Sequence, residues 1–247
     1  MKVYAYSPIH YGAEYLDASI RSYADLVEKI IILYSPKASY GTRSGTCPET
    51  ENQLKEIAFN ASNKVVWKHV SEKSEGGHRG VHKQYFNECD IMFTSDADEV
   101  WWDDKLEATI KEAYDDKEFS HFGVNGKVDL WRSFDNQMID WFAPVRILKN
   151  KGKGQRNIDC PYLHFGYAQS WEIIEYKMSI HGHIGEVRKL YGSVQNYLNV
   201  IKGWNVESDG KFHPASRDIW KKSQPYDKSL MPDLMKDHKY YNTENIW

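Results

Sequence analysis

The sequence predicts an α/β fold, in which a mostly parallel central sheet is flanked by helices within a single compact domain. Two observations lead to this prediction. Short apolar runs alternate with segments of helical spacing through the first third of the chain, and a repeated β-α pattern favours a doubly wound, mostly parallel sheet. A length of 247 residues, 41% of them hydrophobic, is enough to bury a sizeable core.

The first elements follow from local patterns. Residues 2–6 are expected to form a strand, and residues 14–24 a helix, because apolar side chains recur there at helical spacing. The continuous apolar run over residues 29–34 is typical of a strand buried in a parallel sheet. A helix over 50–62 and a strand over 64–70 complete the second β-α repeat.

The next elements are a helix over 81–88, a strand over 90–95 and a charged helix over 105–116. The second half of the chain is less regular. We expect strands over 120–124 and 143–148 and a helix over 171–180. Loops and short helices are expected over the last forty or so residues, because prolines recur there.

The composition excludes several classes of protein. Lys+Arg of 32 and Asp+Glu of 35 give a formal net charge of −3, which excludes a wholly basic nucleic-acid binder. No apolar run approaches the ~20 residues of a membrane-spanning helix, and residues 1–6 are typical of a strand rather than of a signal peptide. The cysteines are widely separated and odd in number, which favours a reducing compartment. We therefore expect a cytoplasmic protein.

The most informative motif is Ser95-Asp96-Ala97-Asp98-Glu99, directly after an apolar strand. Alternate residues of an extended segment point to the same side, so we expect Asp96 and Asp98 to present their carboxylates together. Ligands gather at the carboxyl ends of strands in such sheets. A carboxylate pair there suits a hard divalent cation, Mn²⁺ or Mg²⁺, which would neutralise a departing diphosphate. An acidic turn that caps the next helix is the structural alternative.

Further candidates lie at the ends of the first two strands. No glycine-rich phosphate loop follows the first strand, so the chain resembles neither a dinucleotide-dependent dehydrogenase nor a P-loop NTPase. Tyr6, Ser7 and Pro8 could instead form a surface for a base or ribose, together with Tyr34 and Ser35. Ordinary strand-end turns are the alternative for each of them.

Basic and imidazole groups provide the remaining candidates. Arg79, His82 and Lys83 share one side of a predicted helix and could contact a diphosphate, or form a solvated polar face. Lys177 and His181 are four residues apart on another predicted helix. A neutral imidazole is a common metal ligand, so either His164 or His181 could complete a metal site.

A basic run and a set of aromatic residues also suggest contact with nucleic acid. Phosphate backbones attract such runs, and aromatic rings can stack on an extruded base. A solvated, glycine-containing loop is the alternative for the run. The residues concerned are Arg146, Lys149, Lys151, Lys153 and Arg156 in the run, and Trp204, Phe212 and Trp220 among the aromatics.

Three segments, residues 3–8, 15–22 and 93–101, resemble the GT-A glycosyltransferases, closest to family-2-like enzymes. The stretch His164-Phe165-Gly166-Tyr167, followed by Lys177, is similar to a segment of small bacterial and phage members. The resemblance covers the first 115 or so residues well and the rest loosely. It implies a GT-A fold, with a nucleotide-sugar-binding half over 1–115 and an acceptor-binding half over 116–247.

The resemblance also implies roles for residues. The donor would be a nucleotide-diphosphate sugar, with Mn²⁺ or Mg²⁺ held by Asp98, and with Asp96 near the ribose or the metal. His164 or His181 would complete the metal site, and Lys177 would join the donor-binding residues. The candidate catalytic carboxylates are Asp98, Asp129, Asp140 and Asp159, none of which stands out as the general base.

The predicted function is therefore a metal-dependent glycosyltransferase that transfers a sugar to an acceptor hydroxyl. Two alternatives stay open. One is a phage DNA glycosyltransferase that modifies hydroxymethylated pyrimidines in the host cytoplasm, and the other is a non-catalytic sugar- or nucleic-acid-binding module on a degenerate GT-A scaffold. The pairs Trp131-Arg132 and Trp141-Phe142 are expected to line an acceptor cleft, and the acceptor is either a glycan or modified DNA.

Overall fold

The computed structural model describes residues 1–37, 46–70, 75–216 and 219–247. Within them the chain forms two compact units. The first contains Met1–Lys37, Glu49–Lys127 and Trp141–His164. The second is built mainly from Val128–Asp140 and Phe165–Trp247.

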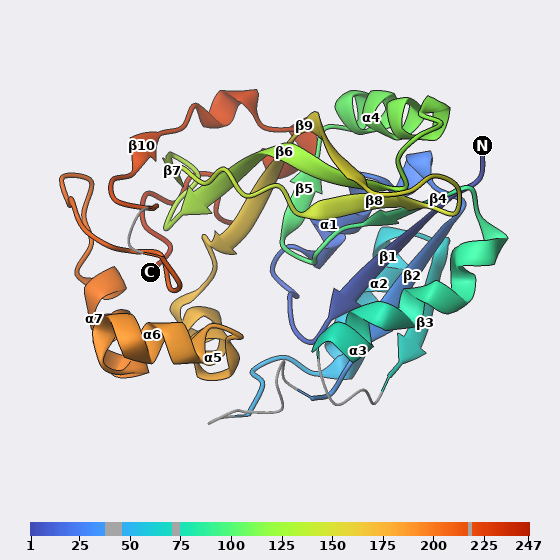
Figure 1. Cartoon of the computed structure of the whole chain (residues 1–247). Helices are drawn as coiled ribbons and strands as arrows, with labels where there is room; N and C mark the ends of the chain where they lie inside the picture. The colour runs from blue at the N-terminus through green and yellow to red at the C-terminus, as the bar shows by residue number, and fades with distance from the viewer. Residues whose placement is uncertain (38–45, 71–74, 217–218) are drawn as a thin grey trace. The chain divides into compact units, whose positions relative to one another are not determined.

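The first unit contains a parallel sheet of β1 (Val3–Ile9), β2 (Lys29–Tyr34), β3 (Val65–His69) and β4 (Ile91–Thr94). The strands lie in the order β3-β2-β1-β4, so β1 is central (Figure 1). Because all of these strands run in the same direction, their carboxyl ends meet at one edge of the sheet.

Antiparallel strands extend this sheet beyond β4. There β4 pairs with β8 (Val145–Lys149), which pairs with the first residues of β6 (His121–Trp131). Next to them β5 (Glu99–Trp101) pairs with β9 (Gln155–Tyr167). The predicted α/β class is confirmed, with antiparallel strands added to the parallel part of the central sheet.

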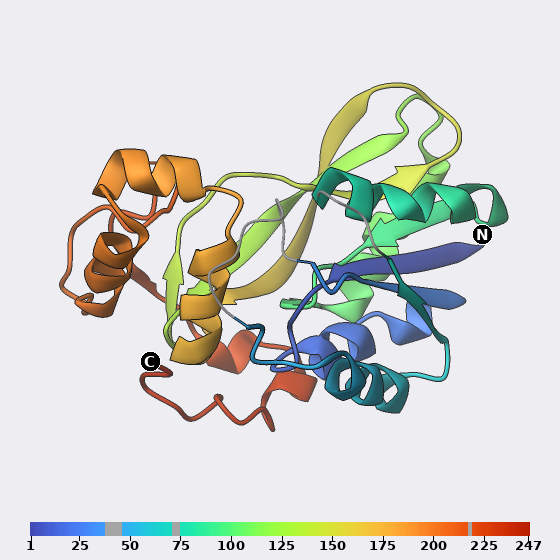
Figure 2. The same ribbon diagram turned by 90° about the horizontal axis from the view of Figure 1, so that it is seen from below.

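Helices cover both faces of the parallel strands (Figure 2). One face carries α1 (Leu16–Arg21), η1 (Ala24–Leu26) and α2 (Glu51–Ala61), and α4 (Asp103–Asp115) packs into the same core. The other face carries α3 (Glu75–Gly80) and the 3₁₀ helix η3 (Val81–Glu88).

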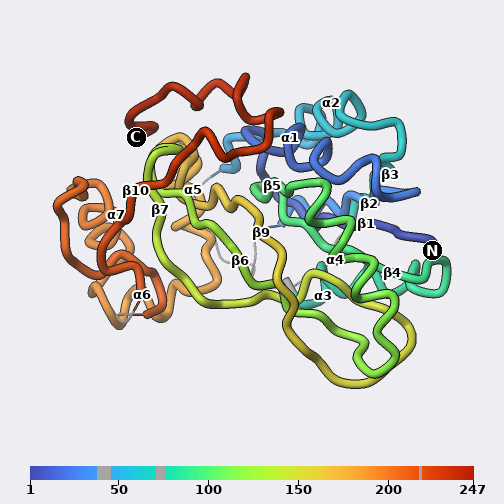
Figure 3. The backbone as a smooth tube through the Cα atoms, turned by 90° about the horizontal axis from the view of Figure 1, so that it is seen from above, coloured from blue at the N-terminus to red at the C-terminus, as the bar shows by residue number. Residues whose placement is uncertain are grey.

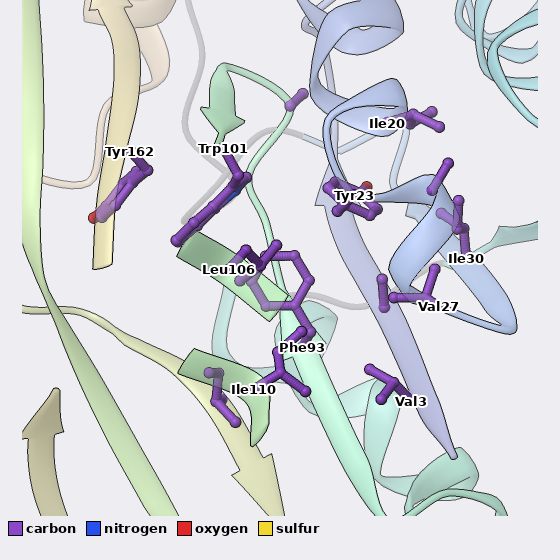
Figure 4. Close-up of a cluster of buried hydrophobic side chains, with 14 of the residues drawn as sticks. Val3, Ile20, Tyr23, Val27, Ile30, Phe93, Trp101, Leu106, Ile110 and Tyr162 are labelled. Atoms are coloured by element: carbon purple, nitrogen blue, oxygen red, sulfur yellow. The ribbon is translucent and has the colours of Figure 1, made fainter. Parts of the chain in front are cut away.

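Alternation along the strands divides the core between these two faces. Val3 and Ala5 of β1 belong to the larger cluster, whereas Tyr4 and Tyr6 pack with residues of η3 on the opposite face. In the larger cluster, aromatic rings form a continuous series of contacts from η1 to β9 (Figure 4). The series runs through Tyr23, Phe93, Trp101 and Tyr162, with ring centroids 4.3 to 5.3 Å apart.

The second unit is mainly helical. It contains α5 (Trp171–Ile180), α6 (Ile184–Tyr191) and α7 (Val194–Lys202). The end of β6 pairs there with β7 (Asn136–Met138), and β7 pairs with β10 (Gln224–Pro225). Apart from β10, the described residues beyond α7 form loops and the short 3₁₀ helices η4 (Lys228–Leu230) and η5 (Asp233–Met235) (Figure 3).

Several predicted elements have the expected bounds, and others differ. The strand over 29–34 and the helix over 171–180 are confirmed. The helix predicted over 81–88 is a 3₁₀ helix, and the one predicted over 14–24 is divided into α1 and η1. The strands β5 and β9 and the helices α6 and α7 were not predicted. In β9 the buried side chains alternate strictly from Ile158 to Tyr162, but Pro161, which removes a ladder hydrogen bond, obscures that pattern.

Among the described residues, no helix combines the length and the apolar character needed to cross a membrane.

Candidate functional site in the first unit

The acidic motif forms a turn at the carboxyl end of β4. The Asp96 carbonyl accepts a hydrogen bond from the Glu99 amide at 3.1 Å, and the Asp96 amide donates to Glu99 Oε2 at 3.0 Å. The predicted extended conformation of this segment is therefore wrong. The physical reason is that Glu99 pairs with the backbone of Asp96, which closes the turn. As a result, the carboxylates of Asp96 and Asp98 have different partners.

Two arginines hold the carboxylate of Asp96. Arg79 Nη1 lies 3.1 Å from Oδ1, and Arg146 Nη2 lies 2.8 Å from Oδ2. The same Arg146 nitrogen also contacts Glu99 Oε1. The side chains of Arg146 and Glu99 are only 8% and 1% exposed, so a cluster of four charged groups lies largely inside the protein.

The environment sets the ionisation of these groups. Burial opposes the charge of Asp96, but the positive charges of Arg146 and Arg79 outweigh it and hold its pKa well below the usual range. Burial, together with the charge of Asp96, raises the pKa of Glu99 to about 7, although Arg146 acts in the other direction. Burial likewise opposes the charge of Arg146, but Asp96 and Glu99 raise its pKa above the normal value. Asp96 therefore carries a firm negative charge.

The second aspartate faces a histidine. Asp98 Oδ2 lies 3.8 Å from His164 Nε2, and both side chains are partly exposed, at 17% and 21%. The pairing of β5 with β9 explains this approach, because His164 lies opposite Glu99 in the register. The structure thus brings together Asp98 and His164, which are 66 positions apart in the printed sequence.

The donor set suits a divalent cation that shares its coordination with a ligand. Among the described residues, no group of three or more His, Cys, Asp and Glu side chains could hold a metal ion. A carboxylate oxygen and a neutral imidazole nitrogen are nevertheless both suitable ligands for Mn²⁺, and Mg²⁺ is commonly held by one or two carboxylates with substrate phosphates and water. Asp98 and His164 therefore fit a cation that also binds a diphosphate.

The connection after β1 lies against the acidic turn. Gly12 has a φ of +138°, and a Cβ atom there would lie 2.5 Å from Ala97 Cβ. The buried carboxylate of Glu49 accepts hydrogen bonds from the amides of Gly12 and Ala13, at 2.6 and 2.9 Å. The sequence analysis did not identify Gly12 or Glu49 as site residues. A glycine soon after a strand is a weak signal that only the close approach of Ala97 makes meaningful.

The expected nucleotide surface is largely inward-facing. Tyr6 is buried and its ring stacks on His82, with centroids 4.4 Å apart. Ser7 and Ser35 are buried as well, and Tyr34 is buried with its ring stacked on Trp67. Of the five candidates at these strand ends, only Pro8 is partly exposed. A nucleotide could therefore contact the buried side chains only if these side chains moved. The backbone of these residues lies at the expected edge of the sheet.

The remaining candidates lie outside the charged cluster. Lys83 is exposed on η3, and exposed Asp159 accepts a hydrogen bond from Asn125 Nδ2 at 2.9 Å. In the second unit, Lys177 donates to the Gly166 carbonyl at 2.9 Å, and Asp129 is buried. The partly exposed Asp140 belongs to the same unit.

His181 also belongs to the second unit. Burial of its imidazole, with the positive charge of Lys177 nearby, lowers its pKa to about 3. His181 is therefore neutral at physiological pH and accepts a hydrogen bond on Nδ1 from the His183 amide.

The basic run does not form a continuous cationic surface. Arg146 is buried in the charged cluster, and Lys149 is buried with its Nζ donating to the Ala113 and Asp116 carbonyls near the end of α4. Arg156 pairs with Glu112 and Asp116. Of the run, only Lys151 and Lys153 are exposed. The predicted phosphate-binding run is thus wrong for three of its cations, because they satisfy acidic side chains and helix carbonyls of their own unit.

The aromatic prediction also needs correction. Trp204, Phe212 and Trp220 are buried in the core of the second unit, so they are not available to stack on a base. Trp131 belongs to the same core. The buried Arg132 donates to the carbonyls of Trp204 and Trp247, so Trp131-Arg132 does not line a cleft. The physical reason is that these three rings pack around that of Trp131, with ring centroids 5.7 to 6.2 Å apart.

Trp141 and Phe142 behave differently. Their side chains are 73% and 65% exposed in the connection between β7 and β8. Of the two predicted aromatic pairs, this is the one that is exposed.

Comparisons with known proteins give structural similarities only. No protein-family model matches the chain, and no curated protein matches it either. The solved structure of a mannosyltransferase from Pyrobaculum calidifontis, in complex with GDP-Man and Mn²⁺, is 12% identical over 83% of this chain and 65% of that chain, with a TM-score of 0.44.

Two further solved structures are similar. Glucosyl-3-phosphoglycerate synthase from Mycobacterium tuberculosis, with Mn²⁺, UDP and phosphoglyceric acid, is 13% identical over 50% of this chain and 42% of that chain, with a TM-score of 0.38. The inositol-1-phosphate CTP transferase from T. maritima is 10% identical over 74% of this chain and 97% of that chain, with a TM-score of 0.39. This chain thus spans less than half of the synthase chain, and the activities and ligands named here belong to those proteins.

Proposed function

We propose that the protein is a metal-dependent glycosyltransferase that uses a nucleotide-diphosphate sugar as donor. The observation that supports this most directly is the pair of Asp98 and His164 at the carboxyl edge of the parallel strands, with Arg79 held nearby by Asp96. Such an edge is where open α/β sheets bind ligands. A carboxylate, an imidazole and a guanidinium together suit a diphosphate bound with a divalent cation.

Each residue has a distinct role in the transfer. Asp98 and His164 would hold the cation, which would supply positive charge to the diphosphate leaving group. Arg79 offers a planar, fork-shaped donor to the same phosphates. In the reaction, the acceptor oxygen forms a bond to the anomeric carbon as the bond from that carbon to the diphosphate oxygen breaks. The acceptor proton goes to a base, and of the predicted carboxylates Asp159 is exposed and belongs to the same unit as Asp98.

A glycan hydroxyl is the acceptor that we propose. The exposed rings of Trp141 and Phe142 suit the apolar face of a sugar. The DNA alternative depended on cations that are buried or paired with acidic side chains, and on aromatic rings that lie in the core of the second unit. Duplex DNA requires many phosphate contacts for affinity, and the exposed lysines of the run are too few to provide them.

A binding experiment tests the metal site. Melting temperatures are measured with UDP-, GDP-, dTDP- and CMP-sugars, each with and without Mn²⁺, because ligands that bind the native state raise the melting temperature. We expect one nucleotide sugar to give a Mn²⁺-dependent increase. Asp98→Asn should weaken Mn²⁺ binding by more than about tenfold, the low end of what even an outer-shell partner contributes.

The matched control is Asp104→Asn, which removes the charge of a carboxylate that is 64% exposed in the same unit. It should bind Mn²⁺ and donor like the wild type. If no donor raises the melting temperature of the wild type, with or without metal, the proposal is wrong and the non-catalytic module becomes the better hypothesis.

A further inference from the structure

We infer that Asp96 anchors Arg79 and is not a ligand of the metal, and that Arg146 and Glu99 are positioning residues that hold Asp96 in that role. This inference rests on the proposed function and assigns different roles to the two aspartates of the acidic motif, Asp96 and Asp98. Asp98 faces the cation, and Asp96 fixes a separate positive group for the diphosphate.

The first argument is the occupancy of the Asp96 carboxylate. Each of its oxygens pairs with a different guanidinium, Arg79 on Oδ1 and Arg146 on Oδ2. A divalent cation on either oxygen would lie within a few ångströms of two positive charges, and like charges at such distances repel strongly at low dielectric. Asp98 instead faces the imidazole of His164, with 3.8 Å between Oδ2 and Nε2.

The second argument is the closed set of contacts behind Asp96. Arg146 joins the carboxylates of Asp96 and Glu99 through one nitrogen, and Glu99 Oε2 accepts from the Asp96 amide. Glu99 thus binds both the arginine and the backbone of the residue that this arginine holds. Because Arg146 and Glu99 are almost fully buried, this set of contacts has no role on the surface, and its effect is to orient Asp96.

The third argument is the exposure of Arg79. It extends from the last turn of α3, and its side chain is 38% exposed, the most exposed of the four charged groups. A guanidinium that is anchored by a carboxylate and still reaches the surface is preorganised for phosphate oxygens. The cation at Asp98 and the guanidinium of Arg79 would therefore contact the same diphosphate from two independently held positions.

The experiment separates metal binding from diphosphate binding. Binding of Mn²⁺ alone is measured by electron paramagnetic resonance, and UDP, GDP and dTDP are then titrated in the presence of Mn²⁺. For Asp96→Asn we expect Mn²⁺ affinity within about twofold of the wild type and nucleoside-diphosphate affinity reduced by about tenfold, as for the loss of one charge-assisted contact. Asp98→Asn should lose Mn²⁺ binding.

Arg146→Lys tests the positioning role. Lysine keeps the positive charge, but its ammonium is more strongly hydrated than a guanidinium and is less suited to a buried ion pair. We therefore expect Mn²⁺ binding to persist and diphosphate binding to weaken as in Asp96→Asn. The matched control is Arg156→Lys, in an arginine that pairs with Glu112 and Asp116 away from the cluster. It should bind both probes like the wild type.

Folding is checked for every variant by circular dichroism. Arg79→Met changes the most exposed member of the cluster, and it gives the same test if Asp96→Asn does not fold: diphosphate affinity falls while Mn²⁺ affinity stays. If Asp96→Asn or Arg79→Met weakens Mn²⁺ binding as much as Asp98→Asn does, the inference is wrong and the proposed metal site stands. If the wild type does not bind Mn²⁺, the inference and the proposed function both fail.

Discussion

At the scale of single residues, the role of Arg146 depends on the carboxylates with which it pairs. In the sequence it begins a run of cations, whereas in the structure it lies buried between Asp96 and Glu99. Removing a buried ion-pair partner is costly because the remaining charges stay out of water without compensation. An exposed ion pair contributes far less, because water solvates its members when they separate.

We therefore expect Arg146→Met to lower the free energy of unfolding by about 3 to 5 kcal/mol. Arg156→Met, in a partly exposed pair, should lower it by less than about 1 kcal/mol. Urea unfolding followed by fluorescence measures both values. Equal losses in the two variants would contradict the burial argument.

At the scale of elements, the connection between β1 and α1 supports the acidic turn. The Glu49 carboxylate accepts hydrogen bonds from two backbone amides of this connection, and Gly12, which has no Cβ, leaves room for Ala97. The turn that carries Asp98 is therefore held from the side by a segment that precedes it by more than eighty positions in the printed sequence.

The Gly12→Ala variant tests this support. Its new Cβ would lie 2.5 Å from Ala97 Cβ, and its φ of +138° is rarely adopted by L-residues. We expect a loss of at least about 1 to 3 kcal/mol of stability, together with weaker Mn²⁺ binding. Gly76→Ala is the control, because no atom lies within 4 Å of the added Cβ. If both variants bind Mn²⁺ equally well, the connection does not position the turn.

At the scale of the whole molecule, the burial of the His181 imidazole makes the free energy of unfolding depend on pH. His181 has a pKa lowered to about 3 by burial. The unfolded chain takes up a proton at this residue near pH 6.5, the ordinary value for histidine. Its contribution to stability is therefore complete above pH 6.5 and is lost progressively as the pH falls toward 3.

From this shift we expect the free energy of unfolding to fall by about 1 to 2 kcal/mol between pH 7 and pH 5. His181→Gln should flatten this part of the profile, since glutamine does not titrate. The control is His121→Gln, at an exposed side chain of the first unit, and it should unfold with the same slope as the wild type. Tryptophan fluorescence reports the transition, because several tryptophans form the core of this unit. A slope unchanged in His181→Gln would assign the acid sensitivity to other groups.

Local patterns were sufficient for several elements and for part of the site. The apolar run of β2 and the helical spacing of α5 depend on neighbours in the sequence, and both elements have the predicted bounds. Asp98 and His164 could be proposed from residue type and position, and the structure places them 3.8 Å apart. The strand β9, which carries His164, was missed because a proline within it argues against a strand, although the buried side chains alternate across Pro161.

The sequence by itself determined the alternating strands and helices, and with them the sheet edge at which the acidic motif lies, because these depend on periodicity over a few residues. Only the tertiary structure decided which charges meet. The charged cluster joins three separate segments of the chain, which carry Arg79, Asp96 and Arg146. Folding places these side chains within ion-pair distance of one another. The same is true of Trp204 and Trp220, whose burial in the second unit depends on packing that no local pattern encodes.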